Sequence, residues 1–117
     1  MSYHEHTDHH YAKHIRAGAP AAFKAFTAWD AEVMRGDDKV IPRKYTELMA
    51  LAVALTTQCP YCIEAHTGAA HSAGATQQEL AETIMIAAAL RAGGSYAHGF
   101  MAMKFFDHAE GGEIPGG

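Results

Sequence analysis

The two cysteines of the chain, Cys59 and Cys62, are separated by two residues and are the side chains best suited to redox chemistry. A pair at this spacing can alternate between dithiol and disulfide with little backbone motion. Pro60 suits the first position of a helix, so Cys59 is the expected N-cap and Cys62 falls in the first turn. Because a helix N-terminus stabilises anions, we expect lowered pKa values for both thiols, with Cys59 at least as acidic as Cys62.

His66 and Glu47 are the candidates for moving the thiol protons. Cys62 and His66 are four positions apart, so their side chains share one face of a helix. Glu47 lies on the preceding helix in an apolar segment; if it is buried near the thiols, its pKa rises and it can act as a base. The alternatives are a solvated or ion-paired carboxylate for Glu47 and a histidine satisfied by core or interface contacts for His66.

Zinc binding is the main alternative chemistry for the same residues. Cys59, Cys62 and His66 give three ligands of the types that zinc prefers, with His71 or Glu47 as a fourth. Both cysteines lie on one short helical turn without a second ligand pair elsewhere, so a closed tetrahedral site is hard to build and we predict no metal. Two cysteines buried as small apolar side chains are the remaining alternative.

The segments around these residues are predicted to be helices, because alanine is abundant and β-branched residues never gather into alternating runs. Pro20 suits the first turn of a helix that ends near Arg35. Phe23, Phe26 and Trp29 recur at helical spacing, so this helix is expected to bury an aromatic face.

Further proline, glycine and capping signals divide the rest of the chain. Pro42 begins a helix with a wide apolar surface, typical of a core or a subunit interface, and Gly74 ends the helix of the cysteines. Thr76 and Glu79 form a capping box at the start of the next helix. Gly93-Gly94 is expected to break or kink that helix before a last one over about residues 96–108.

The length of 117 residues suits a single domain, 1–117, which we predict to be an all-α bundle of five or six helices. It includes a His-rich N-terminal segment, 1–19, and a flexible tail, 109–117. We predict no metal role for the N-terminal histidines, since ordering a weakly patterned segment costs entropy. The apolar, alanine-rich helices are too numerous for so short a chain to bury alone, so we expect a homo-oligomer.

Net charge and hydropathy limit the classes of partner that we expect for this protein. The formal charge of −4 speaks against nucleic acid as the main partner. The sequence contains no unbroken run of eighteen apolar residues, so we predict no transmembrane helix. The polar N-terminus lacks the apolar middle of a signal peptide, and together these features favour a cytoplasmic protein with no membrane partner.

The four candidate residues form the pattern Glu47-x11-Cys59-x2-Cys62-x3-His66. This pattern resembles the motif of the AhpD-like alkylhydroperoxidases, which belong to the carboxymuconolactone decarboxylase superfamily. Four residues at set spacing are more specific than a lone Cys-x-x-Cys. The sequence around the motif and the later alanine-rich run 87–94 are also similar to this family, and the resemblance covers about residues 20–107.

The resemblance implies an AhpD-like helical subunit that assembles into trimers or hexamers. It implies an antioxidant thiol peroxidase that reduces hydroperoxides without a bound cofactor and is re-reduced by an external dithiol or thiol protein. If the family's residue roles are carried over to this chain, Cys62 attacks the peroxide. Cys59 is then the resolving thiol, which forms the disulfide and meets the reductant, and Glu47 and His66 relay protons. Tyr61 departs from the family pattern, because well-studied peroxidases of the family have a relay histidine between the cysteines.

Two other functions stay open beside the peroxidase. Cys59-Pro60-Tyr61-Cys62 also resembles the active sites of general thiol–disulfide oxidoreductases. A non-enzymatic oligomer that senses redox state or binds zinc through the cysteines is the alternative from another class. Lactone decarboxylation is disfavoured, because the decarboxylases of the superfamily do not depend on such a pair.

Overall fold

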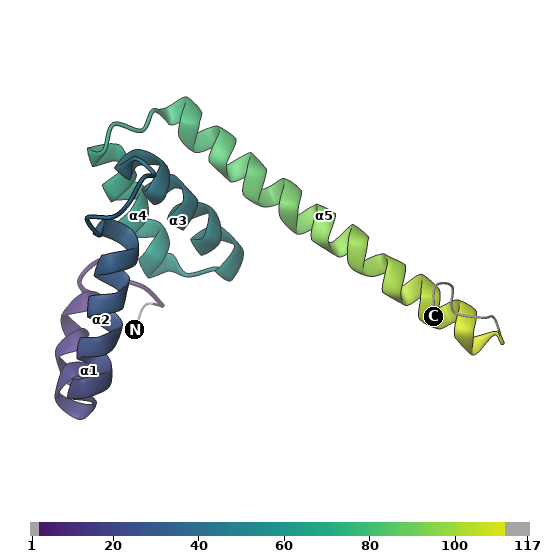
Figure 1. Ribbon diagram of the computed structural model, residues 1–117, viewed down its shortest axis with the longest axis horizontal. Helices are drawn as coiled ribbons and strands as arrows, with labels where there is room; N and C mark the ends of the chain where they lie inside the picture. The colour runs from purple at the N-terminus through teal and green to yellow at the C-terminus, as the bar shows by residue number, and fades with distance from the viewer. Residues whose placement is uncertain (1–2, 112–117) are drawn as a thin grey trace.

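The computed structural model describes residues 3–111, and these form helices joined by short loops (Figure 1). In chain order the elements are a 3₁₀ helix η1 (Asp8–Tyr11), α1 (Ala12–Gly18), α2 (Pro20–Arg35), α3 (Arg43–Thr57), α4 (Pro60–Ser72) and α5 (Gln77–Ala109). Residues 3–111 contain no strand, so the predicted all-α class and helix number are confirmed. None of the described helices combines the length and the apolar character needed to span a membrane.

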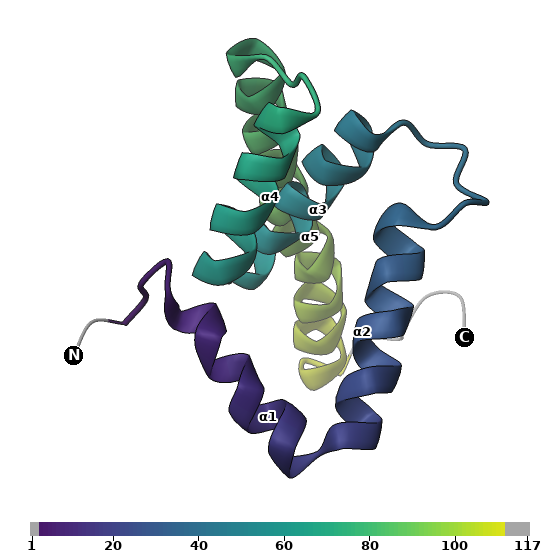
Figure 2. The same cartoon turned by 90° about the vertical axis from the view of Figure 1, so that its left-hand side faces the viewer.

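The core is small and is centred on α3, which packs against α4 and against the first part of α5 (Figure 2). It consists of the following buried apolar side chains: Met34, Leu48, Leu51, Ala54, Ala70 and Ala87. Helices α1 and α2 diverge from their junction as a V, and the turn after α2 leads into α3. The helices that carry the four candidate residues are therefore the best-packed part of the chain.

Local signals set the ends of the central helices where the sequence predicts them. Pro60 is the first residue of α4 and Cys59 is its N-cap. Thr76 and Glu79 form both hydrogen bonds of the capping box that begins α5. Gly74, with φ of 93°, takes the left-handed conformation in the turn between these two helices. Most of the predicted flexible tail, 109–117, lies outside the described residues.

The predicted break at Gly93-Gly94 is wrong, because α5 runs through both glycines without interruption. Glycine costs only about 1 kcal/mol relative to alanine inside a helix. The alanine-rich sequence before the pair and the capping box at Thr76 are sufficient to carry the helix through. The second half of α5 consequently projects away from the body of the molecule (Figure 1).

The aromatic face expected to be buried on α2 is instead largely exposed. Phe26 is 60% exposed and Trp29 is 65% exposed, and Met34 alone is buried on this helix. The helical spacing of these side chains is as predicted, but no segment among the described residues covers them. The projecting half of α5 is similar, with Tyr96, Phe100 and Met103 all more than 60% exposed.

Candidate active site

The dithiol lies at the N-terminus of α4. Gln58, in the left-handed conformation with φ of 59°, ends α3 and lets the chain turn directly into the next helix. Cys59 then adopts an extended conformation, and its sulfur accepts a hydrogen bond from the backbone N–H of Cys62 at 3.3 Å. Both cysteines are free thiols and partly exposed, so reagents can reach the pair.

The two thiols have opposite pKa shifts. A hydrogen bond from the Cys62 thiol, followed by one from the Cys62 backbone N–H, lowers the pKa of Cys59. The same hydrogen bond between the sulfurs, together with burial and the nearby charge of Cys59, raises the pKa of Cys62 to about 11. Of the two thiols, Cys59 is therefore the one that loses its proton more readily.

This order agrees with the prediction that Cys59 is at least as acidic as Cys62, but the prediction of a lowered pKa for both thiols is wrong. The N-terminus of a helix can stabilise one anion at this site. A second thiolate one turn away would face a like charge, so ionisation of Cys59 suppresses that of Cys62.

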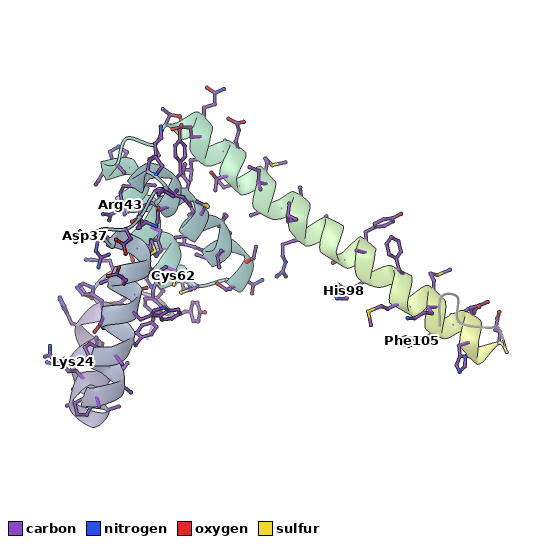
Figure 3. All side chains as sticks on the ribbon, in the orientation of Figure 1. Lys24, Asp37, Arg43, Cys62, His98 and Phe105 are labelled. Atoms are coloured by element: carbon purple, nitrogen blue, oxygen red, sulfur yellow. The ribbon has the colours of Figure 1, made fainter. Side chains whose placement is uncertain are left out.

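Glu47 and His66 are brought together from α3 and α4. Glu47 Oε2 lies 2.6 Å from His66 Nδ1, and the carboxylate is almost completely buried, with 1% of the residue exposed. A second hydrogen bond, of 2.7 Å, runs from Arg43 Nε to Glu47 Oε1. Figure 3 shows Arg43 and Cys62 in the same part of the molecule, with α5 projecting away from them.

The expected rise in the pKa of Glu47 does not occur. Burial alone raises this pKa, but hydrogen bonds from His66 and Arg43 together outweigh burial, and the pKa is lowered. Glu47 is therefore an ionised acceptor and not a neutral acid. A carboxylate only accepts hydrogen bonds, so the His66 proton is on Nδ1 and Nε2 is the nitrogen that can take up another proton.

Arg43 is a member of this cluster that the sequence analysis missed. It is four residues before Glu47 on α3, a spacing that places opposite charges on one helix face. The missed signal was present in the sequence, but the same spacing is common on solvated helices and does not by itself indicate a buried carboxylate.

The N-terminal segment also contacts the cysteine helix, which the sequence did not predict. The Tyr61 hydroxyl donates to Asp8 Oδ2 at 3.0 Å, and this bond to the carboxylate is the main cause of the raised pKa of Tyr61. His4 Nε2 lies 2.8 Å from Glu64 Oε2. These contacts span more than fifty residues of sequence, so no local pattern could reveal them.

Two other histidines considered from the sequence, His71 and His98, lie apart from the dithiol. His98 lies on α5, where Nδ1 is 3.0 Å from the Gly94 carbonyl oxygen, and Figure 3 shows it away from Cys62. His71 lines a hollow between α4 and the start of α5. Within residues 3–111, no three His, Cys, Asp or Glu side chains gather closely enough to hold a metal ion.

The helical fold, the dithiol at a helix N-terminus and the buried carboxylate–histidine pair identify the class of this protein. It is an all-α protein with a dithiol site. This chain belongs to the carboxymuconolactone decarboxylase family, whose sequence model matches residues 20–105. Within that superfamily it is AhpD-like, as the motif of four residues predicted.

Relatives of the chain extend over most of its length. It is 41% identical over 96 residues to uncharacterised protein 4 of the cox locus of Paracoccus denitrificans, covering 82% of this chain and 84% of the relative. It is 32% identical over 90 residues to an uncharacterised protein of Cupriavidus necator, covering 75% and 76% of the two chains. The crystal structure of an apo carboxymuconolactone decarboxylase family protein from Legionella pneumophila is similar, with a TM-score of 0.61, 29% identity and coverage of 68% and 69%.

Proposed function

We propose that this protein is a thiol-dependent peroxidase that reduces hydroperoxides through a cycle of dithiol and disulfide at Cys59 and Cys62, in an antioxidant role. The observation that carries the proposal is the hydrogen-bonded thiol pair at the start of α4. The pair lies on the same helix as His66, whose ring is held by the buried carboxylate of Glu47. Membership in a family that includes peroxidases supports it.

The cycle starts with attack of the Cys62 thiolate on the terminal oxygen of the hydroperoxide. The O–O bond breaks, an alcohol leaves with the former thiol proton, and Cys62 becomes a sulfenic acid. The Cys59 thiolate then attacks the sulfenic sulfur, the S–O bond breaks as the disulfide forms, and the hydroxyl group leaves as water after taking a proton from solvent. An external dithiol reduces the disulfide through a mixed disulfide and is itself oxidised.

In the proposed cycle, the pKa shifts of the two thiols mean that a proton has to be removed from Cys62 in the first step. Since the pKa of Cys62 is raised to about 11, its thiol needs a base. His66 Nε2, one turn further along α4, is the base in this proposal, and the ionised Glu47 stabilises the imidazolium that forms. The lowered pKa of Cys59 favours the thiolate form that the resolving step uses.

Two serine variants test the division of labour. We expect Cys62→Ser to lose hydroperoxide consumption in stopped-flow assays. Cys59→Ser should complete one turnover and then stop, leaving a sulfenic acid on Cys62 that dimedone traps and mass spectrometry locates. If Cys62→Ser keeps the first turnover and Cys59→Ser loses it, the attacking thiol is Cys59, as the resting pKa order favours.

The same assays separate the peroxidase from its alternatives. The lowered pKa of Cys59 on an exposed helix N-terminus also suits general thiol–disulfide exchange. Rapid reduction of a protein disulfide combined with hydroperoxide consumption no faster than in Cys62→Ser would favour that second function. Failure of both activities in the wild-type protein would favour a non-enzymatic sensor.

We further propose that the working unit is a homo-oligomer. The exposed aromatic and methionine side chains of the projecting half of α5 support this, because apolar surfaces of this extent mark interfaces in proteins. A trimer or a hexamer is the form implied by the family resemblance.

A further inference from the structure

Residues 96–106 of α5, called here the arm, expose apolar side chains on two opposite faces of the helix. Tyr96, Phe100 and Met103 lie on one face and are all more than 60% exposed. Met101 and Phe105 lie on the opposite face and are 49% and 58% exposed. A contact between two arms would cover one face of each, so a helix of this kind has to be covered by a second surface as well.

An uncovered apolar surface of matching character lies on α2. Phe26 and Trp29 are 60% and 65% exposed, and their ring centroids are 6.3 Å apart. Val33, one turn further along the helix, is exposed too and continues the same face. These three side chains, called here the α2 face, form the kind of apolar stripe by which one helix packs against another.

The arm and the α2 face do not cover each other within one copy of the chain. Helices α2 and α5 make no contact among the described residues. Figure 1 shows α2 at one end of the molecule and the arm at the other end. The partner of each surface therefore has to come from outside its own copy.

The surface area of the chain indicates what kind of partner that is. The chain exposes 9163 Å², whereas a compact monomer of 12.6 kDa would expose about 6,200 Å². The excess of about 3,000 Å² is far above the roughly 800 Å² that one partner contributes to a standard interface, and it reaches the size found in permanent assemblies of identical chains. Lys104 is the one permanently charged residue of the arm, and the centres of such interfaces are depleted in charge. A second copy of this chain is the partner that fits both surfaces.

We propose that the arm of one copy packs on the α2 face of a second copy, so that each copy gives one arm and receives another. The inference rests on the proposed homo-oligomer and names the two surfaces that join its subunits. A contact between two different surfaces of the same chain closes by symmetry into a pair or a ring of copies. The arrangement is therefore compatible with a trimer and with a hexamer.

The fluorescence of Trp29 tests the contact directly, because this residue is the only tryptophan of the chain and lies on the α2 face. In the wild-type oligomer we expect emission at short wavelength and weak quenching by acrylamide, as for a covered side chain. Phe100→Asp alters the arm and leaves α2 unchanged, yet it should move the emission to longer wavelength and raise the quenching severalfold. The matched control is Ala102→Asp, on the side of the arm that carries His98, and it should change neither quantity.

Mixing two kinds of copy shows whether the arm acts between subunits. Trp29→Phe copies contribute no tryptophan fluorescence but keep an intact arm, whereas Phe100→Asp copies keep Trp29 and have a defective arm. When the two are refolded together from urea with Trp29→Phe in excess, the Trp29 emission should move back to shorter wavelength. Copies that carry both substitutions replace Trp29→Phe in the control and should give no recovery.

A variant of the other surface separates loss of the contact from loss of the fold. Phe26→Asp charges the α2 face and leaves the arm unchanged, and its side chain is exposed in the single copy, so the helix content in circular dichroism should be that of the wild type. We expect this variant to dissociate the oligomer in light scattering as Phe100→Asp does, although the two helices do not touch within one copy.

Three results would overturn the inference and leave the homo-oligomer intact. They are a wild-type oligomer in which Trp29 behaves as an exposed side chain, shielding of Trp29 that Phe100→Asp leaves unchanged, and absence of recovery in the mixture. A monomeric wild-type protein would remove the homo-oligomer and the inference with it, and binding of that monomer to vesicles of phosphatidylcholine and phosphatidylglycerol would assign the arm to a lipid surface. Hydroperoxide consumption, measured in parallel, reports separately on the proposed peroxidase.

Discussion

Glu47 is hydrogen-bonded to the ring of His66. Its carboxylate joins His66 from α4 to Arg43 of its own helix, and all three are linked by hydrogen bonds shorter than 2.8 Å. A buried, ionised carboxylate with two charge-assisted partners fixes the orientation of an imidazole and stabilises its protonated form. In the proposed cycle Glu47 is thus a positioning residue, which acts through His66 Nε2.

Replacing Glu47 with glutamine tests this role through stability and its pH dependence. The lowered pKa of Glu47 contributes stability that is present above the unfolded value of 4.5 and is lost as the pH falls through the folded value. At pH 7 we expect Glu47→Gln to lower the free energy of unfolding by about 2 kcal/mol. The difference from the wild type should shrink as the pH falls below about 4.5, as measured by urea unfolding.

The control is Glu82→Gln, which removes an exposed carboxylate from α5. It should leave the unfolding free energy within about 0.5 kcal/mol of the wild type at both pH values. A destabilisation by Glu47→Gln that is the same at pH 7 and pH 4 would contradict the argument, since it would mean that the carboxylate charge is not what stabilises the fold.

Helix boundaries in this chain follow local signals, and helix burial does not. The prolines at positions 20 and 60 and the Thr76–Glu79 capping box act within one turn, so the sequence predicts these helix starts correctly. The pairing of Glu47 with His66 could be suspected from the motif, but the partner Arg43 and the lowered pKa depend on three-dimensional packing. The contact of His4 with Glu64 joins distant parts of the sequence and has no local signal.

Helix α5 runs through Gly93 and Gly94 without a break, so the effect of these glycines on the stability of the helix can be predicted. A Cβ at either glycine meets no atom within 4 Å in this chain, so nothing in the subunit itself requires glycine there. Replacing both glycines with alanine should stabilise the helix locally by about 1 kcal/mol each. Amide hydrogen exchange over residues 95–106 should therefore become slower, as followed by mass spectrometry.

The opposite substitution on the same helix, Ala92→Gly, is the matched control and should speed exchange over the same residues. If the double alanine variant instead exchanges faster, the glycines lie at a close helix–helix approach in an assembly. The prediction that alanine fits at both glycines without a close contact would then be wrong.

The described residues form an extended shape with much apolar helix surface left uncovered. Its radius of gyration is 20.0 Å and its extents are 57 × 40 × 38 Å. A compact chain of this length would have a radius of gyration of about 13 Å. The sequence revealed the excess of apolar helix surface, but periodicity shows only that a face is apolar and does not identify what covers it.

The projecting half of α5 is where the proposed oligomer can be tested most sharply. Tyr96, Phe100 and Met103 share one face of the helix, and all three are more than 60% exposed. Phe100→Asp places a charge at the centre of this face, so we expect dissociation of the oligomer to monomers of 12.6 kDa in light scattering after size exclusion. Ala102→Asp places the same charge toward another face and should leave the mass of the oligomer unchanged. A wild-type protein that is monomeric at micromolar concentration would contradict the proposed oligomer. If Ala102→Asp dissociates and Phe100→Asp remains an oligomer, the interface lies on the other face of α5.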